Sequence, residues 1–354
     1  MRVLIAGGGT GGHLYPGIAV AEEFCRQEPD SEVLFVGTKR GIETKVLPRE
    51  GYKLEIIPAG GIVNKDMISK MVSGIKMIGG FIRSFSILKR FDPDVVIGVG
   101  GFASVPVLSA SVILRLPTVI LEQNLFPGLA NRVLSHAVDC VVVAFEGSKT
   151  FFKREVKVFG NPVRQSIIGC KTIPKDSFVV FVFGGSQGAH TINKAVVESL
   201  DYLKEEAGRI IFIHQTGDRD CAWVKDSYEK TGIAAEVVPY IHNIAEVYNK
   251  ADIVISRSGA TTIAEITACG RPALLIPYPL ATHDHQRINA EYLESMGTAE
   301  VISECDLSGK KIAEKIKYFL YNIGRLKEMS EKSAGLYRKT AASDIVNLCR
   351  ELVK

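Results

Sequence analysis

Glycine-rich loops after short apolar runs are the first places in this chain where chemistry is expected. Gly7 to Gly12 follow the apolar run Val3 to Ala6 and precede a helix-like stretch that contains Pro16. In such a turn between a strand and a helix, backbone N–H groups and the positive helix end can hold a phosphate or a developing oxyanion. The alternative is a tight turn that only packs strand against helix.

A second glycine cluster closes the apolar run Val95 to Val99 in the same half of the chain. It offers a further set of backbone donors, and two such loops in one half suggest a diphosphate ligand. The candidates are Gly100, Gly101, Phe102, Ala103 and Ser104. A close-packed turn is the alternative for this cluster as well.

The second half of the chain carries a hydroxyl-rich helix start, Arg257 to Glu265, after the run Ile253 to Ser256. Its backbone N–H groups can take phosphate oxygens, and Glu265 can accept hydrogen bonds from the vicinal hydroxyls of a ribose. Alternatively, Thr261 or Thr262 acts with Glu265 only to cap the helix.

A polar run from His283 to Ala290 follows another strand-like segment. Gln286 and Asn289 lie three residues apart, share a helical face and can hydrogen-bond sugar hydroxyls. His283 and His285 have poor spacing for a metal on a helix, so no metal site is predicted.

Other nucleotide-binding enzymes fit these loops less well. A dinucleotide enzyme needs a carboxylate at the end of its second strand to hold a ribose. Lys39 and Arg40 stand there instead, which suits a 2′-phosphate and leaves an NADP reductase as an alternative. A non-catalytic nucleotide-binding module also remains open, whereas no glycine is followed by the Lys-Ser or Lys-Thr of a P-loop ATPase.

The elements that position these loops are short apolar runs that alternate with longer amphipathic stretches, which predicts parallel sheets built of βαβ units. The predicted strands are Val3–Ala6, Val33–Val36, Val95–Val99, Thr118–Leu121, Cys140–Val143, Val156–Phe159, Val179–Phe183, Ile210–His214, Ile253–Ser256 and Ala273–Ile276.

A turn-forming triplet at Gly160 to Pro162 separates two halves that start alike. Residues 2–13 and 178–190 both read strand, glycines, hydroxyl residue, glycine, histidine and helix. We therefore expect two similar α/β domains, 1–162 and 163–336, with a final helix at about 337–354 that packs back on the first.

Composition excludes several classes of protein. A chain of 354 residues with a net charge of +4 has room for two cores and no overall demand for nucleic acid. Seven scattered cysteines suit a reducing cytoplasm. The apolar start is too short for a signal peptide, and the longest apolar run, Val105 to Leu114, is too short to span a membrane, so any membrane contact is expected to be peripheral.

Six motifs occur in an order that resembles the MurG family of glycosyltransferases, family 28, over nearly the whole chain. They are Gly8–His13, Glu122–Asn124, Gly160–Arg164, Gly184–Ala189, Arg257–Glu265 and His283–Ala290. The resemblance implies a GT-B fold, an α/β architecture in which two Rossmann-like parallel-sheet domains face a deep interdomain cleft. It also implies transfer of N-acetylglucosamine from UDP-GlcNAc to the 4-hydroxyl of undecaprenyl-pyrophosphoryl-MurNAc-pentapeptide, with inversion and without metal or cofactor. Another nucleotide-sugar GT-B transferase is the alternative.

Carried over motif by motif, the resemblance implies site residues. The donor candidates are Thr10, Gly11, Gly12, Asn124, Arg164, Ser186, Ile241, Ala260, Thr261, Thr262, Ile263, Ala264, Glu265 and Gln286, to which the residue pattern adds Asn289. The cluster Gly100 to Ser104 becomes a candidate for the acceptor diphosphate. Arg164, the Ser186 loop and the helix start after Ser258 can meet the charge of the departing UDP.

A transfer of this kind needs a base for the attacking hydroxyl. His13 is the first candidate, because a helix N-terminus disfavours imidazolium and keeps the ring neutral. A structural histidine that bonds its own loop is the alternative. Glu122 is the second candidate, unless it positions Asn124.

The stretch from Asn64 to Arg90 combines apolar residues with an excess of lysine and arginine. Such a stretch suits an anionic membrane surface, although part of its apolar stripe must be core. With a lipid-linked acceptor, we expect a peripheral protein at the cytoplasmic face of the cell membrane, where other cell-wall enzymes are candidate partners.

Overall fold

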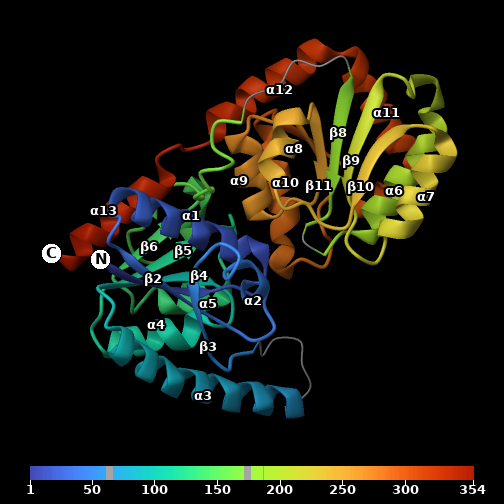
Figure 1. Cartoon of the computed structure of the whole chain (residues 1–354). Coiled ribbons are helices and arrows are strands. Elements are labelled where there is room, and N and C mark those ends of the chain that lie inside the picture. The colour runs from blue at the N-terminus through green and yellow to red at the C-terminus, as the bar shows by residue number, and fades with distance from the viewer. Residues whose placement is uncertain (61–66, 171–176, 186) are drawn as a thin grey trace. The chain divides into compact units, whose positions relative to one another are not determined.

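A computed structural model describes residues 1–60, 67–170, 177–185 and 187–354, without the side chains of 67–73 and Thr282. The chain forms two compact units (Figure 1). The first consists of Met1–Gln165 and Arg338–Lys354, and the second of Ser166–Tyr337. The chain therefore returns to its first unit after it has completed the second.

The first unit contains a seven-stranded sheet in the order β3-β2-β1-β4-β5-β6-β7, and every pairing is parallel. Its strands are β1 (Arg2–Gly7), β2 (Glu32–Gly37), β3 (Lys53–Ile56), β4 (Val95–Gly100), β5 (Thr118–Glu122), β6 (Cys140–Val143) and β7 (Lys157–Val158). The central strands are almost wholly buried, because helices cover both faces of the sheet.

The second unit repeats this order in a six-stranded parallel sheet, β10-β9-β8-β11-β12-β13. Its strands are β8 (Phe178–Phe183), β9 (Ile210–Gln215), β10 (Ala234–Val238), β11 (Ile253–Ser256), β12 (Ala273–Leu275) and β13 (Ala299–Val301). β8 has the place in its sheet that β1 has in the first, so the two glycine loops leave equivalent strands. The predicted parallel α/β fold is confirmed, and each run predicted above to be a strand forms one, whereas the longest apolar run, Val105 to Leu114, lies almost wholly in helix α4 (Ser104–Ile113).

Two layers of helices enclose the first sheet (Figure 1). They are α1 (Gly11–Gln27), α2 (Glu43–Val46), α3 (Met67–Phe91), α4 (Ser104–Ile113), α5 (Leu129–Leu134), the 3₁₀ helix η1 (Glu146–Phe151) and α13 (Ala341–Val353). On one face, α13 packs against α1 and buries Ile345, Val346 and Cys349 in that core. Arg350 also bonds Glu28 at 2.7 Å. On the other face, α3 packs against α4.

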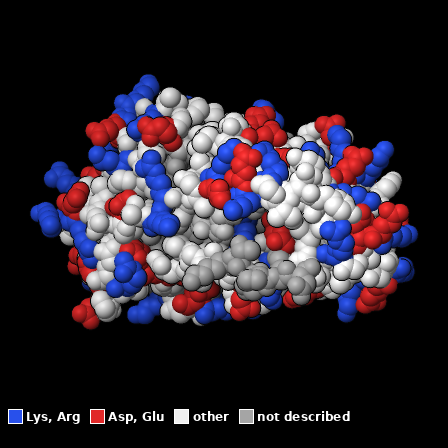
Figure 2. Space-filling view, turned by 90° about the horizontal axis from the view of Figure 1, so that it is seen from above, with Lys and Arg blue, Asp and Glu red and all other residues white. Residues whose placement is uncertain are grey.

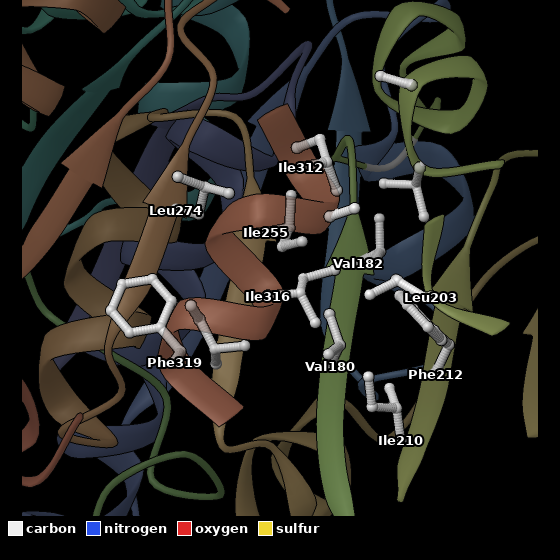
Figure 3. Packing of buried hydrophobic residues seen from close by; sticks show 14 of the residues in the cluster. Val180, Val182, Leu203, Ile210, Phe212, Ile255, Leu274, Ile312, Ile316 and Phe319 are labelled. Atoms are coloured by element: carbon white, nitrogen blue, oxygen red, sulfur yellow. The ribbon is translucent and has the colours of Figure 1, made fainter. Parts of the chain in front are cut away.

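The second core lies where α11 crosses its sheet. Figure 3 shows Ile312, Ile316 and Phe319 of α11 on the strand residues Val180, Val182 and Ile255. The helices of this unit are α6 (His190–Ser199), α7 (Cys221–Thr231), α8 (Ile244–Lys250), α9 (Ala260–Ala268), α10 (His285–Ser295), α11 (Gly309–Tyr321) and α12 (Ile323–Leu336), with 3₁₀ turns η2 (Leu200–Tyr202), η3 (Lys204–Glu206), η4 (Thr282–Asp284) and η5 (Glu304–Asp306). Each buried Ile or Phe contributes roughly 1.5–3 kcal/mol by leaving water.

Acidic and basic side chains are interspersed over the face of the molecule that Figure 2 shows. Charge attraction to a partner would therefore come from a local group of residues rather than from the whole face. In the part of the chain that the structure describes, no helix is both long enough and apolar enough to cross a membrane.

Candidate functional site

The first half-site lies at the carboxyl edge of the first sheet, where β1 has neighbours on both sides. β1 pairs with β2 and with β4, which is the point where the order of the strands reverses and where sheets of this kind bind ligands. The loop after β1 and the cluster after β4 touch here, because the Gly8 N–H donates to the Gly100 carbonyl at 3.3 Å. A Cβ on Gly101 would lie 2.4 Å from the Gly8 carbonyl oxygen, so this contact requires glycine. The fold thus brings the two predicted loops together.

A buried carboxylate that the sequence analysis missed occupies part of the first loop. Glu43 is fully buried, and its Oε2 accepts from the Gly9 N–H at 2.8 Å. Its Oε1 accepts from the N–H and the hydroxyl of Thr38, at 2.8 and 3.1 Å. The negative charge of a carboxylate at Gly9 repels a phosphate there, so any anion that this loop binds is expected at Thr10, Gly11 and Gly12. The same charge disfavours the pyrophosphate of a dinucleotide.

Ser104 closes the second cluster internally. Its hydroxyl lies 2.7 Å from the Ala6 carbonyl oxygen and accepts from the Gly100 N–H at 3.0 Å. Because both groups bond within the protein, the close-packed turn describes these two residues better than a diphosphate site does. Ala103 is buried, whereas Phe102 is 57% exposed and Gly101 is half-buried. Any acceptor diphosphate would therefore meet the cluster at Gly101 and Phe102.

His13 lies at this junction, in the first turn of α1. Its Nδ1 is 3.2 Å from Oε1 of Gln123, which follows β5. The ring packs closely on Gly100, where a Cβ would lie 2.6 Å from the same Nδ1. His13 is half-buried, so contacts from two neighbouring strand ends fix the ring while part of it stays accessible.

The carboxylate of Glu122 accepts hydrogen bonds from the segment 124–131 of its own unit. The side chain is buried, and Oε1 accepts from the N–H and the side-chain amide of Asn124 at 3.0 and 3.2 Å. Oε2 accepts from the Gly128 N–H at 3.0 Å and from the Asn131 amide at 2.8 Å. Four donors around one carboxylate leave little capacity to remove a proton from a substrate. The structure therefore favours the positioning role, in which Glu122 orients Asn124.

Arg164 lies over a residue of α1 in the same unit. Its guanidinium carbon is 4.1 Å from the centre of the Tyr15 ring, two residues after His13. Burial raises the pKa of the Glu22 carboxyl, and the Gln165 N–H, at 2.8 Å, and the charge of Arg164 oppose that rise. Arg164 thus holds a positive charge near the start of α1. A residue that stabilises the charge of the departing UDP must carry such a charge.

The second half-site lies at the carboxyl edge of the second sheet, where α9 begins. Gly259 is its N-cap and has no side chain with which to cap the helix. Glu265 lies in the second turn and is buried, and its Oε2 accepts from the Tyr248 hydroxyl at 3.3 Å. A capping box places its carboxylate three residues after the N-cap, whereas Glu265 lies six residues after Gly259, which argues against the capping alternative. Thr261 and Thr262 are half-buried, whereas Ala260, Ile263 and Ala264 are buried, so these three can reach a ligand chiefly through their backbone.

The start of α10 is tied to the turn before α9. The Ser258 hydroxyl donates to the Gln286 carbonyl at 2.7 Å, and the Asn289 amide donates to the Ser258 carbonyl at 3.2 Å. Asn289 is fully buried, so it holds this turn and is poorly placed to meet a sugar hydroxyl. Gln286 is half-buried, and its Oε1 accepts from the Tyr278 N–H at 3.0 Å. Of the predicted pair, Gln286 keeps the better position for a ligand.

The preceding residues adopt a strained backbone. His283 and Asp284 have φ angles of 53° and 55°, in the left-handed region that non-glycine residues rarely adopt.

Across the described residues, no group of three or more His, Cys, Asp or Glu side chains is placed to hold a metal ion.

Gln215 links two predicted donor-binding segments, and the sequence analysis missed it. Its amide nitrogen donates to the Gly185 carbonyl at 3.0 Å, and its Oε1 accepts from the Ile241 N–H at 2.8 Å. Ser186, the next residue of that glycine loop, lies outside the described residues. A polar residue at the end of the buried strand β9 was the signal in the sequence.

The residue before Gln215 in β9 is a buried histidine, His214. His214 Nε2 bonds the Asn193 side-chain oxygen at 3.1 Å, and its Nδ1 bonds the Tyr228 hydroxyl at 3.2 Å. Burial lowers the pKa of His214 to about 3, and nearby Asp220 opposes the shift. His214 is therefore neutral at physiological pH and has a structural role.

Comparison with known proteins assigns both units to one protein family. Residues 3–143 match the model of the glycosyltransferase family 28 N-terminal domain, and residues 179–347 match that of the family 28 C-terminal domain. The chain is 46% identical to a protein of Syntrophus aciditrophicus over 358 residues, covering 100% of this chain and 99% of that protein. It is 47% identical to one of Geobacter metallireducens, covering 98% and 97%. Both relatives are named UDP-N-acetylglucosamine–N-acetylmuramyl-(pentapeptide) pyrophosphoryl-undecaprenol N-acetylglucosamine transferase.

Solved structures agree with this placement. The MurG of Acinetobacter baumannii superimposes with a TM-score of 0.76 at 27% identity, covering 99% of each chain. The UDP-GlcNAc 2-epimerase of Neisseria meningitidis, bound to UDP-GlcNAc, superimposes with a TM-score of 0.69 at 16% identity, covering 99% and 100%, and supports the fold alone.

Proposed function

Because the chain belongs to glycosyltransferase family 28, and within it to the MurG group, we propose that it transfers N-acetylglucosamine from UDP-GlcNAc to undecaprenyl-pyrophosphoryl-MurNAc-pentapeptide. The observation that carries the proposal is similarity to transferases of this name along nearly the entire length of both chains. Two half-sites at equivalent edges of two GT-B sheets support it. The reaction is the one that completes the disaccharide of the peptidoglycan precursor.

The second unit binds the donor in this proposal. The start of α9 gives backbone N–H groups to the diphosphate, and the buried carboxylate of Glu265 accepts from the ribose hydroxyls. Gln215 holds the Gly185 loop and Ile241 around the same ligand. Gln286 is a further donor candidate in this unit, and Thr10 to Gly12, Asn124 and Arg164 of the first unit stay donor candidates on the strength of their motifs.

The first unit binds the acceptor and supplies the base. The acceptor's 4-hydroxyl oxygen forms a bond to the anomeric carbon while the bond from that carbon to the UDP oxygen breaks, and the hydroxyl proton passes to His13. Attack opposite to the departing UDP inverts the configuration. The fixed charge of Arg164 and the N–H groups at the start of α9 stabilise the charge of UDP, a role that metal ions have in other transferases.

The exposed side of α3 attaches the first unit to the membrane in this proposal. Ile75, Ile78 and Ile82 are 68%, 64% and 66% exposed and recur at helical spacing, whereas Ile87 and Leu88 are core. Glu55 pairs with Arg83 and Arg90 at 3.5 and 2.5 Å, so it offsets part of the basic charge that the sequence suggested. The three isoleucines therefore carry more of the attachment than charge does. Lys65 and the side chain of Lys70 lie outside the described residues.

Such attachment places the enzyme peripherally at the cytoplasmic face of the cell membrane. Its acceptor is anchored there, and other enzymes of cell-wall synthesis are possible neighbours.

Transfer of radiolabel from UDP-[¹⁴C]GlcNAc to a polyprenyl-pyrophosphoryl-MurNAc-pentapeptide, with EDTA present, tests the proposed function. We expect labelled lipid and equimolar UDP. Loss of turnover in EDTA that magnesium or manganese restores would refute the metal-independent mechanism. Thermal stabilisation by NADP and not by UDP, with no transfer, would refute the transferase and favour the reductase.

A further inference from the structure

We propose that Gln123 is a positioning residue that fixes the neutral tautomer of His13, with the proton on Nδ1 and the lone pair on Nε2. The inference deepens the proposed function, because it rests on His13 as the base of the transfer reaction. It concerns a residue of the Glu122–Asn124 motif to which neither the motif nor the comparisons give a role.

The orientation of the Gln123 amide follows from its backbone partners. The side chain is buried, and its Nε2 donates to the Val99 carbonyl at 3.0 Å and to the Leu121 carbonyl at 3.2 Å. Both partners are acceptors only, so a flipped amide would oppose its oxygen to two carbonyl oxygens and lose both bonds. The nitrogen therefore faces the strands, and Oε1 faces outward.

His13 is the group that Oε1 meets. The distance from Oε1 to Nδ1 is 3.2 Å, and an amide oxygen can only accept. Nδ1 must therefore carry the hydrogen of this bond. In the neutral ring the other nitrogen, Nε2, then has the lone pair, and a general base needs that lone pair to take the proton of the attacking hydroxyl.

Packing opposes a flip of the His13 ring that would move Nδ1 away from Gln123. The ring packs on Gly100, where a Cβ would lie 2.6 Å from Nδ1 and 2.8 Å from Cε1. A rotated ring would bring a C–H rather than an N–H to Oε1. Gly100 has a φ of 94°, so the backbone that admits the ring is one that glycine adopts readily. Gln123 and Gly100 thus select both the tautomer and the orientation of His13.

In this motif, the adjacent residues Glu122 and Gln123 orient different side chains. Glu122 ends β5 and orients Asn124, whereas Gln123 orients His13. The two side chains have separate sets of partners, so their variants should have separable effects.

The ¹⁵N NMR spectrum of histidine-labelled enzyme without substrate measures the tautomer directly. The chain has seven histidines, and His13 is assigned by the signals that disappear in His13→Gln. At a pH where the ring is neutral, we expect Nδ1 to be the protonated nitrogen and Nε2 the unprotonated one. The opposite pattern would overturn the inference and leave the transferase proposal intact, because no turnover is involved.

Gln123→Met removes the acceptor and keeps the length of the side chain. We expect its His13 to shift toward the Nε2–H tautomer, and kcat to fall about 10- to 100-fold with UDP-GlcNAc affinity within about twofold, by analogy with the range for groups that orient metal-binding histidines. Normal kcat would overturn the positioning role.

Two further variants separate positioning from loss of stability. Gln123→Glu keeps an acceptor for Nδ1–H, so its His13 should remain the Nδ1–H tautomer although the carboxylate opposes two carbonyls. Gln27→Met removes half-buried hydrogen bonds at the far end of α1, about 21 Å from His13 by helix rise. It should lower the melting temperature without changing the His13 spectrum or kcat. A fall in kcat as large as that of Gln123→Met would assign the effect to stability and overturn the proposal.

Discussion

Glu122→Gln tests whether the carboxylate after β5 organises the site or acts as the base. In the native protein it is buried and accepts four hydrogen bonds of 2.8 to 3.2 Å, two at each oxygen. Glutamine places an N–H₂ group against one pair of donors, so at least two bonds to a charged acceptor are lost. At about 1.5–3 kcal/mol for each such bond, unfolding of the first unit should become about 3–6 kcal/mol easier. That loss corresponds to a fall of roughly 10 °C in its melting temperature.

Calorimetric melting and steady-state kinetics on the same preparation distinguish the two roles. An organising Glu122 predicts a lower melting temperature together with a raised KM for the donor, because Asn124 loses its orientation. A base predicts the opposite combination, in which kcat falls 100-fold or more while stability and KM barely change. That second result would refute the positioning role and return Glu122 to the candidates for proton removal.

Four other variants make separate predictions. His13→Ala should lower kcat about 100-fold or more and leave donor affinity within a few-fold, and near-normal kcat in a stable variant would remove His13 as the base. Glu265→Ala should weaken UDP-GlcNAc binding by about 1–3 kcal/mol in titration calorimetry, and unchanged affinity would reject it as a ribose ligand. His214 has a pKa of about 3 when folded against about 6.5 when unfolded, so the unfolded chain binds its proton first and stability should fall as pH drops from about 6.5 toward 3, by up to about 1.4 kcal/mol per unit. Melting in His214→Gln should depend less on pH over that window, and an equal dependence would contradict the account. Ile78→Glu with Ile82→Glu should reduce sedimentation with anionic vesicles, whereas Ile323→Glu, 58% exposed in the second unit, should not; equal sedimentation of both would reject α3 as the attachment.

The central strands could be read from the sequence because buried parallel strands are continuous apolar runs. Three edge strands were missed. β3, β10 and β13 lie at the ends of the two sheets and include polar residues such as Lys53, Glu236 and Glu300. An edge strand has a neighbour on one side only and is partly exposed, so its composition does not distinguish it from a loop.

The places of candidate residues in the fold could be predicted where a motif follows a strand, as for His13 and Glu265, whose roles stay predictions. Residues that act through a partner distant in sequence could not be predicted in this way. Glu43 meets Gly9 across 34 positions, Gln123 meets His13 across 110, and Gln215 meets Ile241 across 26. Each is a buried polar residue whose acceptor or donor is supplied by another strand end, and only the folded sheet brings those ends together. Conversely, the types of Ser104 and Asn289 suit a ligand, but the fold uses their side chains internally.

NMR analysis of the disaccharide formed by the parent enzyme tests the central claim most directly. Polyprenyl-pyrophosphoryl-MurNAc-pentapeptide and UDP-GlcNAc, which carries an α-linked sugar, are incubated with the enzyme, and the linkage is read from the anomeric proton coupling and from the carbon that bears the new bond. The account predicts a single product with N-acetylglucosamine β-linked to the 4-oxygen of the muramoyl residue. An α-linkage, a bond to another hydroxyl, or hydrolysis of the donor without transfer would contradict it.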